Sequence, residues 1–310
     1  MTEQTTAIAP TDQARAVVNL VLDGLSSQHS RRAYGKALAD FLQWHSSQGR
    51  PALSKALVQA YKVKLEADKL APSTINLRLA AIRKLAAEAS DNALLDPILA
   101  SGVKAVKGVK TAGVRAGNWL TKEQAQRLLN TPDVATVKGL RDRAVLAVLI
   151  GCGLRRSEAA ALTCAHLQQR EGRWCIVDLV GKGNRTRTVP APSWTKAAID
   201  AWLDVAGIAE GRVFRAVNKA GEVTGQDLTD QAIFDVVGEY AAACGLGHIG
   251  AHDLRRTFAK LAHRGGAALD QVQLSLGHSS IQTTERYLGL RQDLTSAPCD
   301  FLGLRLGAEE

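Results

Sequence analysis

Apolar residues recur with the spacing of an α-helix along most of this chain, and only one short stretch alternates with the spacing of a β-strand. In the helix predicted over residues 30–44, for example, Tyr34, Leu38, Phe41 and Leu42 fall on one face. Alanine and leucine dominate the composition, and only 5% of the residues are aromatic, which also favours helices. We therefore predict a mainly α-helical protein with a small antiparallel β-structure in its second half.

The single β-pattern lies between residues 173 and 189. Residues 173–180 (RWCIVDLV) alternate like a strand, Gly181-Lys182-Gly183-Asn184 is typical of a turn, and residues 185–189 alternate again. This pattern predicts an antiparallel β-hairpin. Helices are predicted on either side of it, over residues 14–25, 30–44, 53–67, 72–89, 94–106, 141–151, 157–162, 195–205, 228–243, 251–264, 268–276 and 280–289.

The net charge of the chain is +9, which fits either an ordinary basic protein or one that binds a polyanion such as DNA. The five cysteines form no C-x-x-C pair, so metal-ligand spacing is absent and reduced thiols are expected. No apolar stretch approaches the length of a membrane span, and the first residues lack a signal-peptide pattern. We therefore expect a cytoplasmic protein with no membrane association, no cofactor and no metal.

A basic segment at residues 102–118 divides the chain, which at 310 residues is long enough for two domains. The segment contains no acidic residue, and its lysines recur at every third position, so a helix or an extended chain could place them on one side. A solvated linker and a strap along a DNA backbone explain this pattern equally well. The predicted parts are a flexible tail over 1–12, a helical domain over 13–101, the basic linker over 102–118, an α-rich domain over 119–290 and an apolar C-terminal tail over 291–310.

Five short motifs in the second domain carry candidate chemistry. Two arginines can bind one phosphate through paired hydrogen bonds and stay charged at any useful pH. Histidines and a lysine can donate hydrogen bonds or move protons, and a phenol can attack to form a covalent intermediate. Together these groups suit phosphoryl transfer without a metal. In chain order the motifs are Gly153-Leu154-Arg155-Arg156-Ser157-Glu158, Gly181-Lys182-Gly183, His252-Asp253-Leu254-Arg255, Leu276-Gly277-His278 and Tyr287.

Each motif alone has an ordinary structural explanation. Arg155 can simply pair with Glu158, and Lys182 can be an exposed turn lysine. The histidines can cap helices or lie in the core, and Tyr287 can be half-buried packing. Only the ordered set favours catalysis over these explanations.

The ordered set resembles the signature of the tyrosine recombinase (phage integrase) family, which runs Arg, Lys, His-x-x-Arg, His or Trp, and then Tyr. The segments GLRRSE and VGKGNRTRTVPAP match its first-arginine and hairpin-lysine motifs, and Tyr287 follows His278 by nine residues, as in the family. The resemblance covers residues 120–290 closely and the helical region before them more loosely. One departure is Arg256, where many relatives have a histidine.

The resemblance implies a role for each position. Two arginines would bind the scissile phosphate, a lysine would protonate the leaving 5′ oxygen, one histidine would assist the attacking phenol and the other would donate to a phosphate oxygen. The tyrosine would form a 3′-phosphotyrosine bond that keeps the energy of the phosphodiester, so neither ATP nor a metal is needed. Glu158 and Arg256 would support the site, and Asp253 would point away from the DNA. In the order of these roles, the implied catalytic residues are Arg155 and Arg255, Lys182, His252, His278 and Tyr287.

The family also implies an architecture and partners. The helical core-binding domain and the catalytic domain would form a C-shaped clamp around double-stranded DNA with inverted-repeat core sites, and Lys104, Lys107, Lys110 and Arg115 would cross its backbone. A homotetramer would act on two DNA sites and pass through a Holliday junction, with each C-terminal tail docked on a neighbouring copy. The short N-terminus favours a simple two-domain recombinase of the Xer or transposon type. Such an enzyme would be nucleoid-associated and would serve integration, excision or resolution of DNA.

Three other functions stay open at this point. A type IB topoisomerase would share the chemistry but would act as a monomer on one duplex. A non-catalytic DNA-binding protein could keep the same fold. A metal-dependent nuclease would need clusters of Asp, Glu or His ligands, which the sequence does not indicate.

Overall fold

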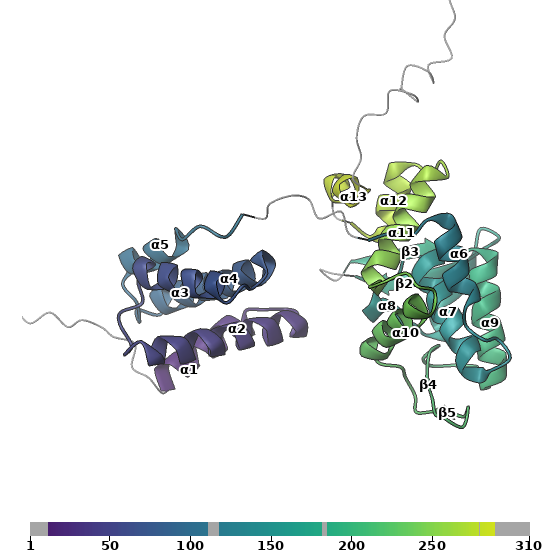
Figure 1. Cartoon of the computed structure of the whole chain (residues 1–310), viewed down its shortest axis with the longest axis horizontal. Helices are drawn as coiled ribbons and strands as arrows, with labels where there is room; N and C mark the ends of the chain where they lie inside the picture. The colour runs from purple at the N-terminus through teal and green to yellow at the C-terminus, as the bar shows by residue number, and fades with distance from the viewer. Residues whose placement is uncertain (1–11, 111–117, 182–184, 279, 289–310) are drawn as a thin grey trace, which may run out of the picture. The chain divides into compact units, whose positions relative to one another are not determined.

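The computed structural model describes residues 12–110, 118–181, 185–278 and 280–288 (Figure 1). The fold is mainly helical, with 61% helix and small antiparallel sheets, which confirms the predicted fold class. The chain divides into two compact units, Met1–Arg115 and Ala116–Glu310, each with its own apolar core. Within the described parts of the chain, no helix is both long enough and apolar enough to cross a membrane.

Helix α4 (Pro72–Asp91) is the centre of the first unit, because it packs against the other four helices described there. Its first residue is a proline, which suits a helix start, and its apolar residues Leu79 and Ile82 are fully buried. The hydroxyls of Ser27 and Ser54 cap the two helices before it by accepting backbone N–H groups. The other helices are α1 (Asp12–Asp23), α2 (Gln28–Ser47), α3 (Lys55–Ala67) and α5 (Pro97–Lys104).

The chain after α5 stays against the first unit as far as Val109. The Asn76 side chain accepts a hydrogen bond from the Val109 N–H at 2.8 Å and donates one to the Val109 carbonyl oxygen at 3.0 Å. Val103 and Val106 are buried in the same core. Each of these three valines is followed by an exposed lysine, namely Lys104, Lys107 and Lys110.

Helix α7 (Val137–Gly151) is the centre of the second unit. Its residues 144–149 are at most 1% exposed, as expected for the apolar helix predicted over 141–151. It packs against the five helices α6, α8, α9, α10 and α11. The α-helices described in this unit besides α7 are α6 (Lys122–Asn130), α8 (Arg156–Ala161), α9 (Ser193–Ala206), α10 (Asp230–Ala243), α11 (Ala251–Arg264), α12 (Leu269–Leu276) and α13 (Ile281–Leu288), and a short 3-10 helix, η1 (Cys164–His166), follows α8.

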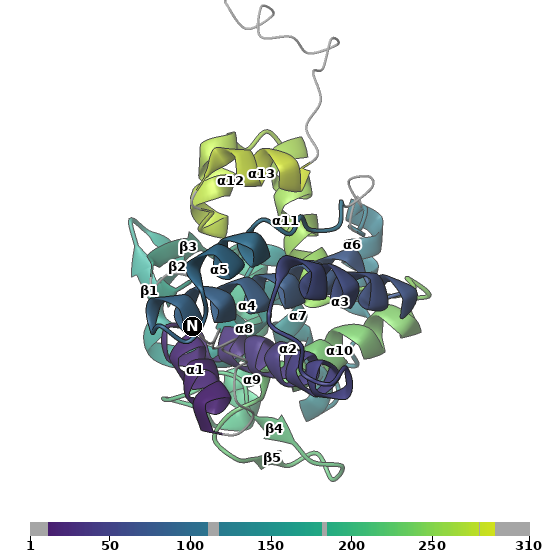
Figure 2. The ribbon, with the colours of Figure 1, turned by 90° about the vertical axis from the view of Figure 1, so that its left-hand side faces the viewer.

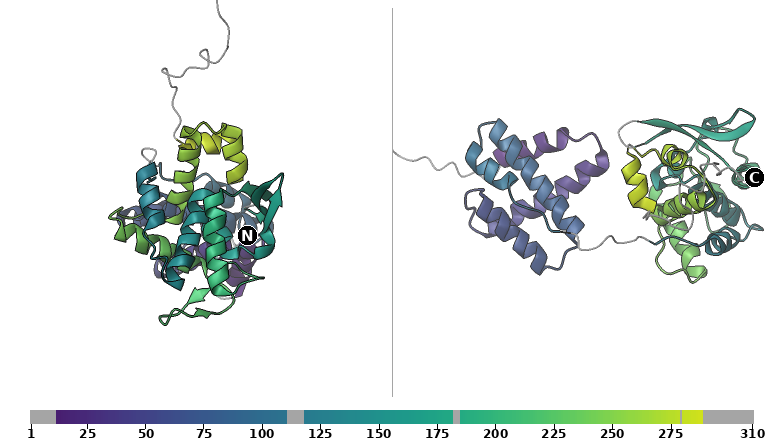
Figure 3. Two further views of the ribbon diagram at one scale, coloured as in Figure 1. Left: turned by 90° about the vertical axis from the view of Figure 1, so that its right-hand side faces the viewer. Right: turned by 90° about the horizontal axis from the view of Figure 1, so that it is seen from above.

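A three-stranded antiparallel sheet lies along one edge of the second unit (Figures 2 and 3). Strands β2 (Arg173–Val180) and β3 (Thr186–Pro190) form the predicted hairpin. Strand β1 (Leu167–Arg170) is not predicted by the sequence, because Leu-Gln-Gln-Arg has no apolar alternation. A second small sheet, β4 (Ala216–Val217) with β5 (Val223–Thr224), lies in a region that the sequence indicates only as a connection.

A β-bulge in β2 changes which side chains of the hairpin face the core. Ile176 pairs with Val189, and Leu179 pairs with Arg187, so the two residues between them on β2 lie opposite a single residue of β3. The extra residue is accommodated at Asp178, whose φ of 54° is left-handed. As a result Ile176 and Leu179 are both buried, and Arg187 lies opposite Leu179.

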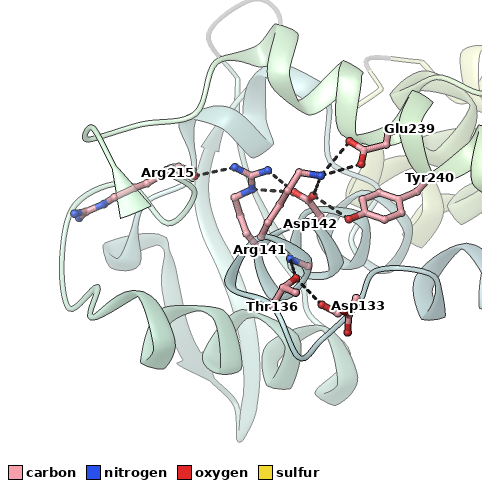
Figure 4. Close-up of polar contacts among 9 residues, drawn as sticks. Asp133, Thr136, Arg141, Asp142, Arg215, Glu239 and Tyr240 are labelled. Carbon is pink, nitrogen blue, oxygen red and sulfur yellow. Dashed lines mark hydrogen bonds and ion pairs between the residues drawn. The ribbon is translucent and has the colours of Figure 1, made fainter. Parts of the chain in front are cut away.

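A buried carboxylate joins α7 to α10 (Figure 4). Asp142 is fully buried and accepts hydrogen bonds from Arg141 at 2.8 and 2.6 Å and from the Tyr240 hydroxyl at 3.1 Å. Lys138 Nζ lies 3.2 Å from Asp142 and 2.9 Å from Glu239. Burial and the neighbouring Asp142 raise the pKa of Tyr240 to about 12. Because a buried charge requires such partners, the network holds the first half of α7 against α10.

Candidate active site

The first-arginine motif lies where α7 leads into α8. Gly153 has a φ of +60°, and a Cβ at this position would lie 2.6 Å from the Phe258 ring, so the turn requires glycine. Arg155 is the N-cap residue of α8, and its backbone N–H donates to Glu158 Oε2 at 2.8 Å. Arg155 Nη1 donates to Glu158 Oε1 at 2.5 Å. The simple ion pair considered from the sequence is therefore present, but it is part of a larger cluster.

Glu158 is the centre of that cluster. Arg187 on β3 donates to both of its carboxylate oxygens, at 2.8 and 2.7 Å, and Arg255 Nη1 lies 3.9 Å from Oε2. Burial alone would raise the pKa of Glu158, but hydrogen bonds from the Arg187 side chain and the Arg155 N–H lower it to about 2. The carboxylate therefore stays charged and orients the guanidinium groups around it.

The same arginines bind the C-terminal end of α12. Arg255 is 2% exposed and donates to the Leu276 carbonyl, and it also donates to a carbonyl of the α7–α8 turn at 2.6 Å. Arg155 Nη2 donates to the Leu276 carbonyl at 3.4 Å, and Arg187 Nε donates to the Ser275 carbonyl at 2.8 Å. The last carbonyls of a helix lack partners within the helix and carry partial negative charge. This helix end therefore gathers three cationic side chains at one place.

Gly277 ends α12, as the sequence predicts, and leaves room for an arginine. Its φ of 61° is the left-handed conformation of a helix C-cap. A Cβ at this position would lie 2.9 Å from Arg187 Cδ. His278 follows directly, and its backbone N–H and carbonyl both bond to Gln273, at 3.2 and 3.1 Å. The glycine thus places His278 beside the arginines.

Two histidines lie close to the cluster, and both have lowered pKa values. For His252, in the first turn of α11, the causes are burial and then Arg256 and Arg255. For His278, burial followed by Arg255 and Arg155 lowers the pKa to about 4. Both imidazoles are therefore neutral at neutral pH, and a nearby anion would raise both pKa values.

Helix α13 meets the cluster through a threonine. Thr284 is fully buried, and its Oγ1 lies 2.9 Å from His278 Nδ1. The helix packs against α11 and α12. Tyr287 lies three residues further along α13, and its side chain is outside the described part of the structure.

Two charged residues within the motifs are engaged outside the cluster. Arg156 Nη2 lies 3.0 Å from Asp230, and its guanidinium packs over the Phe234 ring. Asp253 Oδ2 accepts the Gly250 N–H at 3.0 Å at the start of α11. The Asp253 carboxylate is thus used as a helix cap.

The structure brings together five of the predicted residues, namely Arg155, Glu158, His252, Arg255 and His278. Arg256 also acts on this group, because its charge lowers the pKa of His252. The other predicted residues are distributed differently. Lys182 and Arg115 lie outside the described residues, the backbone of Tyr287 is in α13, and Lys104, Lys107 and Lys110 are exposed on the first unit.

Arg187 is a described site residue that the sequence analysis does not identify. Its guanidinium makes one hydrogen bond to α12 and two to Glu158, and its side chain is only 8% exposed. A signal was available in the hairpin motif, because the alternation of β3 places Arg187 on the same face as the buried Val189.

This arrangement suits binding of a phosphate. Guanidinium groups pair well with phosphate oxygens, and fixed donors stabilise the charge that develops during phosphoryl transfer. Among the described residues, no group of three or more His, Cys, Asp or Glu could hold a metal ion. The cluster therefore has the chemistry to bind a phosphodiester.

The model of the phage integrase family matches residues 118–293, and the model of the phage integrase N-terminal SAM-like domain matches residues 19–92. The chain belongs to the phage integrase family and is a site-specific tyrosine recombinase.

Individual relatives agree with this assignment. The chain is 34% identical over 273 residues to tyrosine recombinase XerC from Myxococcus xanthus, an alignment that covers 84% of this chain and 87% of that protein. It is 36% identical over 170 residues to tyrosine recombinase XerD from Neisseria meningitidis, covering 54% of this chain and 57% of that protein. The same fold is found in a solved structure of XerH site-specific recombinase bound to palindromic difH substrate, a post-cleavage complex. The TM-score is 0.72 at 19% identity, and the match covers 93% of this chain and 94% of that chain.

Proposed function

We propose that this recombinase cuts and rejoins double-stranded DNA through a 3′-phosphotyrosine bond formed by Tyr287. The observation that carries the proposal is the convergence of Arg155, Arg255 and His278 at the C-terminal end of α12. The next helix, α13, contains Tyr287. A phosphate bound at this end of α12 would therefore lie near the helix that contains the nucleophile.

In this proposal Arg155 and Arg255 donate to the non-bridging oxygens of the scissile phosphate. The Arg155 side chain is 30% exposed and that of Arg255 is 2% exposed, so the two approach the phosphate from the surface and from beneath it. Both are already oriented by Glu158 and by the carbonyls of neighbouring turns. An arginine in such a position contributes about 10³–10⁵ to the rate of phosphoryl transfer.

The remaining residues transfer protons or donate hydrogen bonds in this proposal. Lys182, which follows β2 in the sequence, protonates the leaving 5′ oxygen, a contribution of roughly 10²–10⁴. His252 assists the phenol as base or donor, and His278 donates a hydrogen bond to a non-bridging oxygen. The phosphotyrosine bond conserves the energy of the phosphodiester, so rejoining requires neither ATP nor a metal.

The proposal also says how many copies of the protein assemble on DNA and where in the cell they act. The XerH relative is bound to a palindromic substrate, and a palindrome contains inverted repeats. We propose that four copies act on two such sites through a Holliday junction, in the cytoplasm at the nucleoid. Each copy would form a C-shaped clamp from a helical domain over 13–101 and a catalytic domain over 119–290, joined by a linker over 102–118. The segment 291–310 would dock on a neighbouring copy.

A nicked suicide substrate tests this function. The nick releases a short strand after cleavage, so rejoining is impossible and the covalent complex accumulates. In EDTA, the full-length protein is expected to become attached to DNA, and peptide mass spectrometry is expected to find the nucleotide on Tyr287. Cleavage that needs Mg²⁺ and leaves no adduct would indicate a nuclease instead. Relaxation of one duplex without exchange between two sites would indicate a type IB topoisomerase.

The basic segment after α5 leads to another expected result. Replacing Lys104, Lys107 and Lys110 together with alanine should weaken DNA binding, because all three side chains are exposed. The slope of log affinity against log salt should fall by roughly 0.9 per lost phosphate contact. Fluorescence anisotropy at several salt concentrations measures this slope. Lys64→Ala is the control, since Lys64 pairs with Asp68 on the same unit. A triple variant with an unchanged slope would identify the segment as a solvated linker.

A further inference from the structure

A buried hydroxyl touches the ring of one of the two site histidines. Thr284 is fully buried in α13, and its Oγ1 lies 2.9 Å from His278 Nδ1. Buried hydroxyl groups in proteins are hydrogen-bonded, and a neutral imidazole has one N–H donor and one acceptor nitrogen. This contact therefore influences which nitrogen of His278 carries the hydrogen.

Two arrangements fit the distance. If the Thr284 hydroxyl donates to Nδ1, the hydrogen of the imidazole is on Nε2. If Nδ1–H donates to Oγ1, then Nε2 is an acceptor. Only the first arrangement lets His278 donate through Nε2 to a phosphate oxygen, because two acceptors do not form a hydrogen bond.

A protonated ring would donate from both nitrogens, so the choice between the two tautomers matters only if the ring is neutral. Among the described residues, the charged and titratable groups that lower the pKa of His278 include Arg255 and His252 on α11, Arg155 at the start of α8 and Arg187 on β3. Each of them, like burial, opposes the imidazolium form. In the protein without bound DNA the ring is therefore neutral, and its tautomer decides which nitrogen can donate.

The backbone of His278 is already held in place. Its N–H donates to the Gln273 carbonyl at 3.2 Å, and its carbonyl accepts from Gln273 Nε2 at 3.1 Å. The remaining freedom of the residue is rotation of its side chain. The contact with Thr284 restricts that rotation and links it to α13.

We propose that Thr284 is a positioning residue of this recombinase: its hydroxyl donates to His278 Nδ1 and keeps the hydrogen on Nε2, from which His278 donates to the scissile phosphate. The inference rests on the proposed function, in which His278 is that donor. Thr284 belongs to the same helix as Tyr287. One contact thus couples the placement of the nucleophile's helix to the donor state of His278.

Single-turnover cleavage of the suicide substrate at saturating DNA tests this role. Thr284→Val keeps the shape of the side chain and removes the hydroxyl, and the cleavage rate is expected to fall by about 10–100-fold, the loss typical when the hydrogen-bond partner that orients a metal-ligating histidine is removed. DNA affinity should not change. Thr284→Ser should restore most of the rate. Thr283→Val is the matched control, because Thr283 is the exposed neighbour in the same helix.

The tautomer itself can be measured by NMR in the full-length protein labelled with ¹⁵N-histidine, with the His278 signals identified from a His278→Gln variant. We expect a hydrogen on Nε2 and a bare Nδ1 in the wild type and in Thr284→Ser, and a mixture of tautomers in Thr284→Val. A wild-type ring with its hydrogen on Nδ1 would overturn the proposal, as would a Thr284→Val protein with the wild-type tautomer and rate. The spectrum needs no DNA, so it tests this inference even if the wild type forms no covalent adduct and the proposed function fails.

Discussion

Replacing Tyr287 with phenylalanine is expected to abolish covalent attachment of the protein to a nicked suicide substrate. Phenylalanine keeps the aromatic ring and removes only the oxygen that would bond to phosphorus. Loss of a catalytic nucleophile reduces the rate by a factor on the order of 10⁶, which takes the adduct below detection on a denaturing gel. Affinity for the uncut site should change little, because the phenol contributes to the reaction and not to recognition.

Two of the other tyrosines, Tyr61 and Tyr240, are held within the fold and supply the control. Tyr61 is 1% exposed in the first unit, and burial raises its pKa. The Tyr240 hydroxyl donates to the buried Asp142. The Tyr61 hydroxyl likewise has a partner within the protein, Arg78, so we expect neither tyrosine to act as the nucleophile. Tyr240→Phe should therefore lose some stability and keep full adduct formation. An adduct that persists in Tyr287→Phe would refute the assignment of the nucleophile.

A second large effect separates two adjacent arginines. Arg155→Ala is expected to slow cleavage by about 10³–10⁵, since it removes a guanidinium that would bind the scissile phosphate. Arg156→Ala is the matched control, because Arg156 pairs with Asp230 and packs on Phe234, away from the cluster. Its cleavage rate should stay near that of the wild type. The measurement is the single-turnover rate at saturating DNA.

A lysine variant tests whether charge alone is sufficient at this position. Arg155→Lys keeps the positive charge but replaces the planar guanidinium, whose separate nitrogens reach Glu158 and the Leu276 carbonyl, with a single ammonium nitrogen. We expect it to recover only a small part of the lost rate. Equal losses in Arg155→Ala and Arg156→Ala, or wild-type cleavage by Arg155→Ala, would contradict the role proposed for Arg155.

The helices were predictable because each is specified by local features. Apolar spacing indicated α7 as a core helix, and Gly277 indicated the end of α12, where the backbone is left-handed. The hairpin was predictable from alternation on both sides of a glycine-rich turn. Strand β1 was not, since its pairing with β2 depends on contacts formed only in the folded unit. The bulge at Asp178 was hidden for the same reason.

The sequence could predict only those site residues that belong to a motif defined by residue type and order along the chain. Arg155, His252, Arg255 and His278 belong to recognisable motifs, and they come together through the packing of α8, α11 and α12. The alternation of β3 places Arg187 on the buried face, but its role depends on its distance to Glu158, which alternation alone does not give. The contact between Thr284 and His278 likewise depends on how α13 packs.

Glu158 is an acid placed against the very groups that would receive an anion. Its negative charge lowers the attraction of the site for DNA, and a chain with a net charge of +9 can tolerate that loss. In exchange, Arg155 and Arg187 are oriented before any DNA arrives. The cost of orienting these guanidinium groups is thus part of the folding free energy and does not add to the barrier in each round of cleavage. In this enzyme, a carboxylate that weakens binding would speed the reaction.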